Sequence, residues 1–220
     1  MAAYRFAALR LKRMLCLGGA SFFCWLLLSS LLSGCGYLIQ PRVTTGMVNL
    51  EKGSYQLDVS HTSVLFKVGH MNLSTFVGRF NQSDAQLEFD PEHIAAAKLK
   101  AWVDINSIDV NNAELEAQLR DSSWFDATRY PQALFTTTRV QVIDANSADF
   151  TGELTLRGIT QPVVLHVTFN GGGYSLLSGG YVLGFNARAR IQRSRFGMNY
   201  LVPAVGDWVD IEIYAEFKQQ

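Results

Sequence analysis

The segment YVLGFNARARI, residues 181–191, is the strongest indicator of architecture in the chain. Apolar side chains stand at every second position from Tyr181 to Ile191, and the positions between them end in Arg188 and Arg190. In an extended chain a period of two sends successive side chains to opposite faces, so this pattern predicts a β-strand with one buried face. The two arginines share the other face, which we expect to be solvated.

The same alternation recurs between residues 54 and 218 and predicts eight or nine strands in one domain of ordinary size. Tyr55, Leu57 and Val59 fall on one face of the first run, and we expect that face to be buried. The clear runs are 55–59, 64–68, 99–105, 150–156, 163–169, 181–191 and 209–217, and the weaker ones are 76–89 and 135–143.

Turn-forming residues separate these runs. Asp90-Pro91, Asp144-Ala145-Asn146 and Gly179-Gly180 are typical turn sequences, and Gly171-Gly172-Gly173 is expected to form a hairpin that joins two strands. Short links favour an antiparallel meander, and eight such strands can close into a barrel that holds one small ligand. A β-sandwich fits the same alternation, so the pattern alone leaves both folds open.

One segment breaks the period of two. Asn111-Asn112 can cap a helix in which Leu115 and Leu119 lie on one face. A helix of two or three turns is too short to support a domain, so we expect it to pack across one opening of a closed sheet. It would then bring Trp124 and Phe125, at the start of the aromatic-rich stretch 124–135, to the interior.

Residues 1–34 have the layout of a secretory signal peptide. Four basic residues and no acid precede an apolar run from Met14 to Leu32. That run is also long enough to cross a bilayer, so an uncleaved anchor is the alternative. Leu32-Ser33-Gly34-Cys35 resembles the lipobox of bacterial lipoproteins, which predicts cleavage before Cys35 and acylation of its thiol. We therefore expect a signal peptide over 1–34, acylated Cys35 and a tether over 35–53, and a folded domain over 54–218.

The processed chain would be acidic and fixed at a membrane. The leader holds four of the 19 Lys+Arg and none of the 19 Asp+Glu, which leaves 15 bases against 19 acids and a formal net charge of −4. This balance argues against nucleic acid as a partner. Cys35 would be the only cysteine, and several acyl chains on it give stable attachment. Gly36 stands where inner-membrane lipoproteins of enteric bacteria carry aspartate, so we expect a periplasm-facing protein of the outer membrane.

Five phrases in order resemble the YceI-like family of bacterial periplasmic lipid-binding proteins, and together they cover residues 54–218. They are YQLD at 55–58 with HTSVLF at 61–66, FVGRF at 76–80, WFD at 124–126 with Tyr130-Pro131, GELTLRG at 152–158, and RSRFGM at 193–198 with Gly206-Asp207. The resemblance implies an all-β fold, an eight-stranded antiparallel lipocalin-like barrel with one short helix and an elongated cavity. Arg195 and Gln161 depart from the family pattern, in which an acid and a lysine are expected.

The resemblance also implies a ligand, a long-chain amphiphile such as a polyisoprenoid, an isoprenoid quinone relative or a fatty-acid derivative. One histidine would bond its head group at the cavity mouth, and an arginine at the rim would face a pyrophosphate or carboxylate. The residues expected to contact the ligand are His61, Phe66, His70, Phe76, Phe80, Trp102, Phe125, Phe135, Phe185, Arg193 and Phe196.

No catalytic residue, cofactor or metal site is expected. His61 and His70 would face opposite sides of one continuous strand, and no Gly-x-Ser-x-Gly elbow or glycine-rich phosphate loop precedes a helix. We therefore expect a binding protein for carriage or sequestration of lipid rather than an enzyme. The alternative is an envelope interaction module that binds a partner through the outer face of its barrel, and a homodimer stays open.

Overall fold

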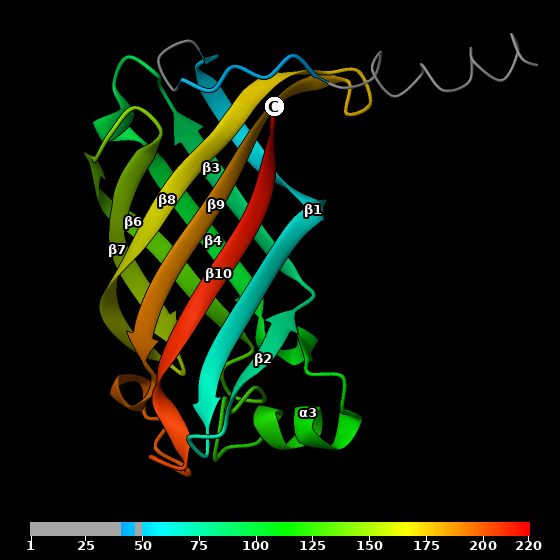
Figure 1. Ribbon diagram of the computed structural model, residues 1–220, viewed down its shortest axis with the longest axis vertical. Coiled ribbons are helices and arrows are strands. Elements are labelled where there is room, and N and C mark those ends of the chain that lie inside the picture. The colour runs from blue at the N-terminus through cyan, green and yellow to red at the C-terminus, as the bar shows by residue number, and fades with distance from the viewer. Residues whose placement is uncertain (1–40, 47–49) are drawn as a thin grey trace, which may run out of the picture. The chain divides into compact units, whose positions relative to one another are not determined.

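The computed structural model describes residues 41–46 and 50–220, and residues 42–220 form one compact unit (Figure 1). The predicted signal peptide, Cys35 and parts of the predicted tether lie outside the described residues. Within the part of the chain that is described, no helix combines the length and the apolar character needed to span a bilayer.

The described residues form ten strands, one α-helix and three short 3-10 helices. The helical segments are η2 (Ile94–Ala96), η3 (Ile105–Ser107), α3 (Ala113–Arg120) and η4 (Arg193–Phe196). The strands are β1 (Gly53–His70), β2 (Ser74–Phe80), β3 (Ser83–Phe89), β4 (Lys98–Asp104), β5 (Ile108–Asp109), β6 (Gln132–Val142), β7 (Ser147–Leu156), β8 (Ile159–Ser175), β9 (Gly180–Gln192) and β10 (Val205–Gln219).

Eight of the strands close into an antiparallel barrel in the order β1-β3-β4-β6-β7-β8-β9-β10, because β10 pairs back with β1. The closing ladder includes Leu57 opposite Phe217 and Val68 opposite Val209. The predicted barrel is therefore confirmed over the sandwich. As predicted, Arg188 and Arg190 lie on the exposed face of β9, while Ala187, Ala189 and Ile191 are buried.

The wall of the barrel is interrupted along β1. β3 pairs with residues 53–56 of β1, and β2 pairs with residues 64–70, so the stretch between Gln56 and Val64 has no ladder partner on that side. On the other side four residues, 59–62, stand opposite Ala215 in a bulge. We call this region the wall gap. Val59, predicted to be buried, is 63% exposed because it lies in the bulge, where the period of two is lost.

The predicted hairpin at Gly171-Gly172-Gly173 is wrong, because β8 continues through these glycines and turns only after Ser175. Arg42–Thr44 instead packs against them. The Thr44 amide donates to the Gly172 carbonyl at 2.8 Å, and the Gly172 amide donates to the Thr44 carbonyl at 3.0 Å. A Cβ on Gly173 would lie 2.5 Å from the Arg42 carbonyl oxygen. The glycines therefore allow close approach of the N-terminal segment.

Helix α3 forms as the sequence predicts. The Asn112 side chain accepts a hydrogen bond from the Leu115 amide at 3.1 Å, and Leu119 is buried. Glu114 and Glu116 lie in the first turn and Arg120 in the last, in keeping with the helix dipole. The chain then folds back, and the Phe125 amide donates to the Leu119 carbonyl at 3.0 Å. This turn directs the aromatic stretch toward one end of the barrel.

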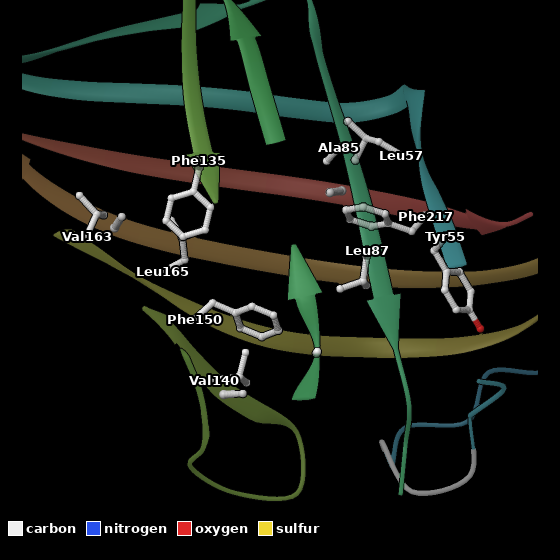
Figure 2. Packing of buried hydrophobic residues seen from close by; sticks show 14 of the residues in the cluster. Tyr55, Leu57, Ala85, Leu87, Phe135, Val140, Phe150, Val163, Leu165 and Phe217 are labelled. Carbon is white, nitrogen blue, oxygen red and sulfur yellow. The ribbon is translucent and has the colours of Figure 1, made fainter. Parts of the chain in front are cut away.

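The other end of the barrel is filled by the core, and we call it the closed end. Tyr55 and Leu183 are among the most deeply buried large side chains, and the Tyr55 hydroxyl donates to the Glu51 carbonyl at 2.6 Å. Figure 2 shows Tyr55 together with other members of the same hydrophobic cluster, such as Leu87 and Phe217, which lie farther along the barrel. The buried side chains that fill this end are Leu50, Tyr55, Phe89, Phe169, Tyr181 and Leu183.

Candidate functional site

The barrel encloses a cavity of about 460 Å³, lined by side chains from all eight of its strands. This volume falls within the range of small-molecule binding sites, about 300–1,000 Å³. The cavity begins below the closed end, whose filling residues are absent from its lining. The described residues that line its deep part are Leu57, Leu87, Leu99, Phe135, Phe150, Phe185 and Phe217.

Small side chains keep the interior hollow. Ala85 pairs directly with Ala101 across β3 and β4, and Ala187 pairs with Ile213 across β9 and β10. Ala133 and Ala215 add two more positions to the lining. Because an alanine side chain ends at Cβ, each of these inward positions leaves space that a leucine would fill. The cavity is thus encoded by small residues on the predicted inner faces.

The mouth of the cavity lies at the end of the barrel opposite the closed end. It is bordered by α3, the β1–β2 turn and the loop 197–204 between η4 and β10, which meet at the lower end of Figure 1. Phe66, Phe80 and Phe125 pack here, with ring centroids 5.5 Å and 5.8 Å apart along the series. A Cβ on Gly78 would lie 2.3 Å from Phe66, so the phenyl ring rests directly over that glycine.

Nine of the eleven residues predicted to contact a ligand line this one cavity. Trp102 lines the cavity from an unexpected position. It pairs with the exposed Leu134 on the outward side of β4, and it reaches the cavity near the wall gap. The nine residues are Phe66, His70, Phe76, Phe80, Trp102, Phe125, Phe135, Phe185 and Arg193.

His61 and Phe196 do not line the cavity. His61 lies in the β1 bulge with its side chain 59% exposed, and Phe196 is buried in the core at η4. The bulge at 59–62 directs His61 to the outside of the barrel, while Thr62, Val64 and Phe66 line the cavity. The histidine at the cavity mouth is therefore His70, at the end of β1.

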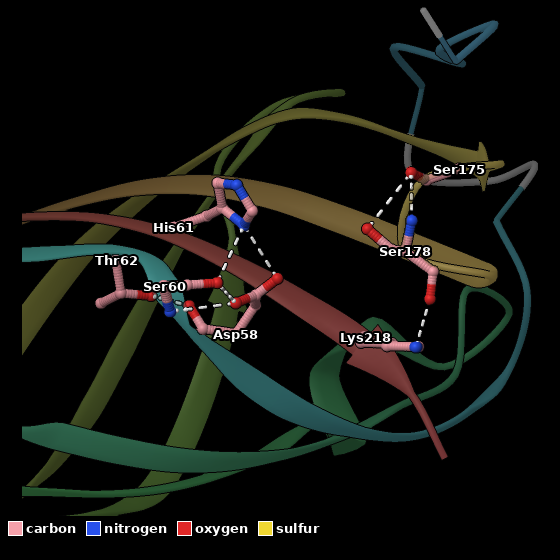
Figure 3. A network of polar contacts seen from close by, with 7 residues as sticks. All are labelled: Asp58, Ser60, His61, Thr62, Ser175, Ser178 and Lys218. Atoms are coloured by element: carbon pink, nitrogen blue, oxygen red, sulfur yellow. Dashed lines mark hydrogen bonds and ion pairs between the residues drawn. The ribbon is translucent and has the colours of Figure 1, made fainter. Parts of the chain in front are cut away.

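His61 is held by its own polar network on the outside of the barrel (Figure 3). Its Nδ1 lies 2.9 Å from Asp58 Oδ2, and the Ser60 hydroxyl donates to Asp58 Oδ1 at 2.5 Å. The Ser60 hydroxyl and then His61 lower the pKa of Asp58 to about 2, while Asp58 raises the pKa of His61. Asp58, His61 and Glu216 together form a group in which each residue offers one atom able to coordinate a metal ion, and these atoms lie within 4.8 Å of one another. A second such group is Asp90, Glu92 and His93.

Arg193, predicted to meet a head group at the rim, is only 3% exposed. Each of its three side-chain nitrogens donates to a backbone carbonyl: Nε to Gly206 at 2.8 Å, Nη1 to Met198 at 2.7 Å and Nη2 to Val205 at 2.8 Å. Its guanidinium carbon lies 5.3 Å from the Trp124 ring centroid. Burial lowers the pKa of Arg193. Arg193 borders the cavity, but its hydrogen bonds hold the loop at the mouth.

Sequence reasoning missed most of the polar lining. Gln118 stands three positions after Leu115 on α3, a spacing that would have placed it on the same helical face. Thr62, Ser83 and Asp84 line the cavity at the wall gap, and only the strand pairing reveals them. Asp84 already accepts hydrogen bonds from the Gln56 side chain and the Ala85 amide. Polar groups therefore occur at the mouth and the wall gap, whereas the deep part is apolar.

Comparison with known proteins agrees with this geometry. The sequence profile of the YceI-like domain matches residues 55–217. A UPF0312 protein of Vibrio cholerae is 35% identical over 161 residues, which cover 73% of this chain and 84% of that protein. Protein YceI of Shigella flexneri is 34% identical over 168 residues, which cover 76% of this chain and 87% of that protein.

Solved structures show the same barrel. BcnA of Burkholderia cenocepacia superposes with a TM-score of 0.66 at 27% identity, covering 73% of this chain and 98% of that one. A polyisoprenoid binding domain from Saccharophagus degradans has a TM-score of 0.56, 12% identity, and coverage of 77% and 100%. This second likeness shows the fold alone. With its family profile matched over the whole barrel and relatives above one-third identity, the chain belongs to the YceI-like family.

Proposed function

We propose that this protein binds one long-chain amphiphilic lipid, a polyisoprenoid, an isoprenoid quinone relative or a fatty-acid derivative, for carriage or sequestration. The observation that carries the proposal is a cavity closed at one end, apolar in its depth and polar only at its mouth and wall gap. An amphiphile is divided in the same way, with an apolar chain that matches the deep part of the cavity and a polar head group that matches the mouth. The name of the Saccharophagus degradans domain, which specifies polyisoprenoid binding, supports this ligand class.

Apolar burial is sufficient for useful affinity. Each buried methylene contributes about 0.8 kcal/mol, so ten of them contribute about 8 kcal/mol. Association costs reduce this value, which would otherwise correspond to about micromolar binding. Such a site needs to exclude water and match the shape of a chain. It does not require a nucleophile or a general base, so we propose a binding role rather than catalysis.

The ligand class is tested by native mass spectrometry of the full chain from a bacterial host, followed by solvent extraction. We expect a bound hydrophobic mass on the wild type and its loss, by at least tenfold, in Ala101→Phe, which fills the cavity. Ala145→Phe, at the exposed β6–β7 turn, is the matched control and should keep the ligand. A wild-type barrel that is reproducibly empty, or an Ala101→Phe variant that is folded and equally loaded, would contradict the proposal.

We further propose that the protein is an envelope lipoprotein, attached through acylated Cys35 and facing the periplasm, with the outer membrane as its site. The sequence around Cys35 supports this proposal. Cys35→Ser should abolish incorporation of labelled palmitate and leave an unprocessed or unattached form. Unchanged processing and membrane attachment in that variant would favour the uncleaved anchor instead.

A further inference from the structure

Large apolar side chains are exposed around the mouth of the cavity. In the β1–β2 turn, Leu73 is 86% exposed and Met71 is 54% exposed. In the loop 197–204, Tyr200, Leu201 and Val202 are exposed as well. We call these five residues the mouth patch. Exposed apolar side chains are ordinary when scattered, but a contiguous group next to a cavity indicates an interaction surface.

The two loops form one surface because they are joined through the backbone. The Met71 amide donates to the Ala204 carbonyl at 2.7 Å, and His70 pairs with Val205. Within the loop the Val205 amide donates to the Leu201 carbonyl at 2.8 Å. The Tyr200 ring stacks edge-on against Trp124 with centroids 5.5 Å apart. The mouth patch is therefore built on a braced support.

The mouth patch is free of formal charge along both loops. Residues 69–75 and 196–206 contain no Asp, Glu, Lys or Arg. Entry of a charged side chain into the boundary between head groups and acyl chains is costly, whereas leucine, methionine and tyrosine are favourable there. An uncharged apolar patch is suited to shallow insertion into a lipid surface and does not require anionic lipid. The nearest charged neighbours in sequence, such as Arg195, flank the loops.

The mouth patch is also continuous with the cavity. Tyr200 and Leu201 are exposed and line the cavity, and His70 and Val205 line it from the bases of the two loops. A lipid that enters or leaves at this end passes between these loops. If the mouth faced water, the apolar chain would have to cross water, at a free-energy cost that grows with every exposed methylene. Contact between the mouth patch and a bilayer removes that step.

We propose that the mouth patch docks on the surface of a lipid bilayer, so that the ligand moves between membrane and cavity without crossing water. This proposal rests on the proposed lipid-binding function and adds the place where the ligand is exchanged. The docking surface is distinct from the predicted attachment at Cys35. Residues Arg42–Thr44 join the barrel at the closed end, beside Gly171–Gly173, and the mouth patch lies at the other end (Figure 1).

The molecule supplies a matched control. In the β8–β9 turn at the closed end, Leu176 and Leu177 are 74% and 75% exposed, yet neither lines the cavity. Met71 and Leu73 likewise do not line it. The two test variants are Met71→Asn with Leu73→Asn, and Leu176→Asn with Leu177→Asn. Asparagine tolerates the left-handed backbone found at Met71 (φ 55°), so the mouth variant introduces no new strain.

The test uses residues 42–220, which contain the closed barrel, α3 and the whole described core, and so exclude the predicted leader and acylated cysteine. Binding to neutral phosphatidylcholine vesicles is measured by co-sedimentation, and transfer of a fluorescent long-chain lipid between vesicles is followed in time. We expect the mouth variant to lose at least tenfold in both measurements and the closed-end variant to match the wild type. Cooperative unfolding of each variant is the folding check.

Other outcomes overturn the proposal. One is a wild-type protein that does not bind neutral vesicles. Another is an equal loss of vesicle binding and lipid transfer in both variants. A third is a concentration-dependent dimer in size-exclusion chromatography that the mouth variant no longer forms. Native mass spectrometry of the same samples separates the two proposals. If the mouth variant carries lipid and binds vesicles as the wild type does, the docking proposal fails and the lipid-binding function stands. If the wild-type barrel is empty, the lipid-binding function itself fails.

Discussion

Arg193 shows how a charged residue can be used inside an apolar barrel. Its guanidinium is buried, stacks on Trp124 and gives hydrogen bonds to the carbonyls of Met198, Val205 and Gly206. Buried charge is costly unless its donors are satisfied, and here each nitrogen has an acceptor. The benefit is geometric: one side chain ties Met198, in the loop at the mouth, to Val205 and Gly206 at the start of β10.

We expect Arg193→Met to lower the free energy of unfolding by about 2–4 kcal/mol, because the carbonyls lose charge-assisted donors. Urea denaturation measures this change. Arg195→Met, at an exposed position two residues on, is the control and should stay within about 0.5 kcal/mol of the wild type. Equal stability of both variants would show that the loop is held by other contacts.

Asp58 and His61 predict a local pH dependence in the β1 bulge. The raised pKa of His61 gives a stabilising contribution that is complete below its ordinary pKa and is lost as pH rises through the raised value. The lowered pKa of Asp58 gives a contribution that is present above its ordinary pKa and is lost as pH falls toward about 2. The bulge is thus most ordered at mildly acidic pH.

The measurement is an NMR titration of the His61 ring. We expect a midpoint above 6.5, the ordinary value for histidine, and a fall toward that value in Asp58→Asn. Because the His61 side chain is largely exposed, the effect on global stability should be small. A midpoint that Asp58→Asn leaves unchanged would contradict the proposed cause.

The contact between Arg42–Thr44 and β8 depends on glycine. A Cβ at Gly173 would meet the Arg42 carbonyl oxygen at 2.5 Å, whereas a Cβ at Gly184 would meet its nearest neighbours, Asn170 Cβ and the Gly171 carbonyl oxygen, only at 3.7 Å. We expect Gly173→Ala to detach the segment and to accelerate hydrogen exchange of the Thr44 amide. In Gly184→Ala that amide should remain protected, and protection in both variants would show that the segment can adjust.

The strands were largely predictable, and the failures have a common cause. Alternation along 181–191 or 209–217 is a local property, so each strand and its buried face can be predicted from one segment. The bulge at 59–62 and the course of β8 through Gly171–Gly173 depend on partners distant in sequence, namely β10 and Arg42–Thr44. The sequence of a single strand does not indicate such partners. This explains why Val59 was wrongly predicted to be buried and why Gly171–Gly173 was wrongly predicted to form a hairpin.

The cavity residues were predictable to a similar degree for the same reason. Phe66, Phe135 and Phe185 follow from strand parity, and Phe125 follows from its place after a helix that covers one end. Parity placed His61 and His70 on opposite faces but could not show which of them reaches the cavity, because His61 lies in the bulge at 59–62. Nor could it show that the donors of Arg193 are directed to backbone carbonyls, because those acceptors lie in the loop 197–204 and at the first two residues of β10, where no alternating pattern points to Arg193.

The barrel as a whole has one filled end and one open end, and this predicts a dependence on ligand length. Affinity for a series of straight-chain alcohols should rise about fourfold per methylene, from about 0.8 kcal/mol each, until the cavity is full and then level off. Fluorescence displacement titration measures the series. Phe217→Ala, which removes a ring from the deep lining, should move the plateau to longer chains. A flat series would place the alcohols outside the cavity.

The filled end also limits the kind of lipid carriage that the proposed function allows. Leu50, Tyr55 and Leu183 block the axis, so a ligand cannot thread from one end of the barrel to the other, and the molecule cannot serve as a conduit between two compartments. A carrier of this shape works as a shuttle: it must leave its donor before it meets its acceptor, and both must recognise the same rim. Donor and acceptor would then compete for the same surface of one protein. The rate of lipid transfer between them would be set by how fast the barrel dissociates from the donor and reorients toward the acceptor.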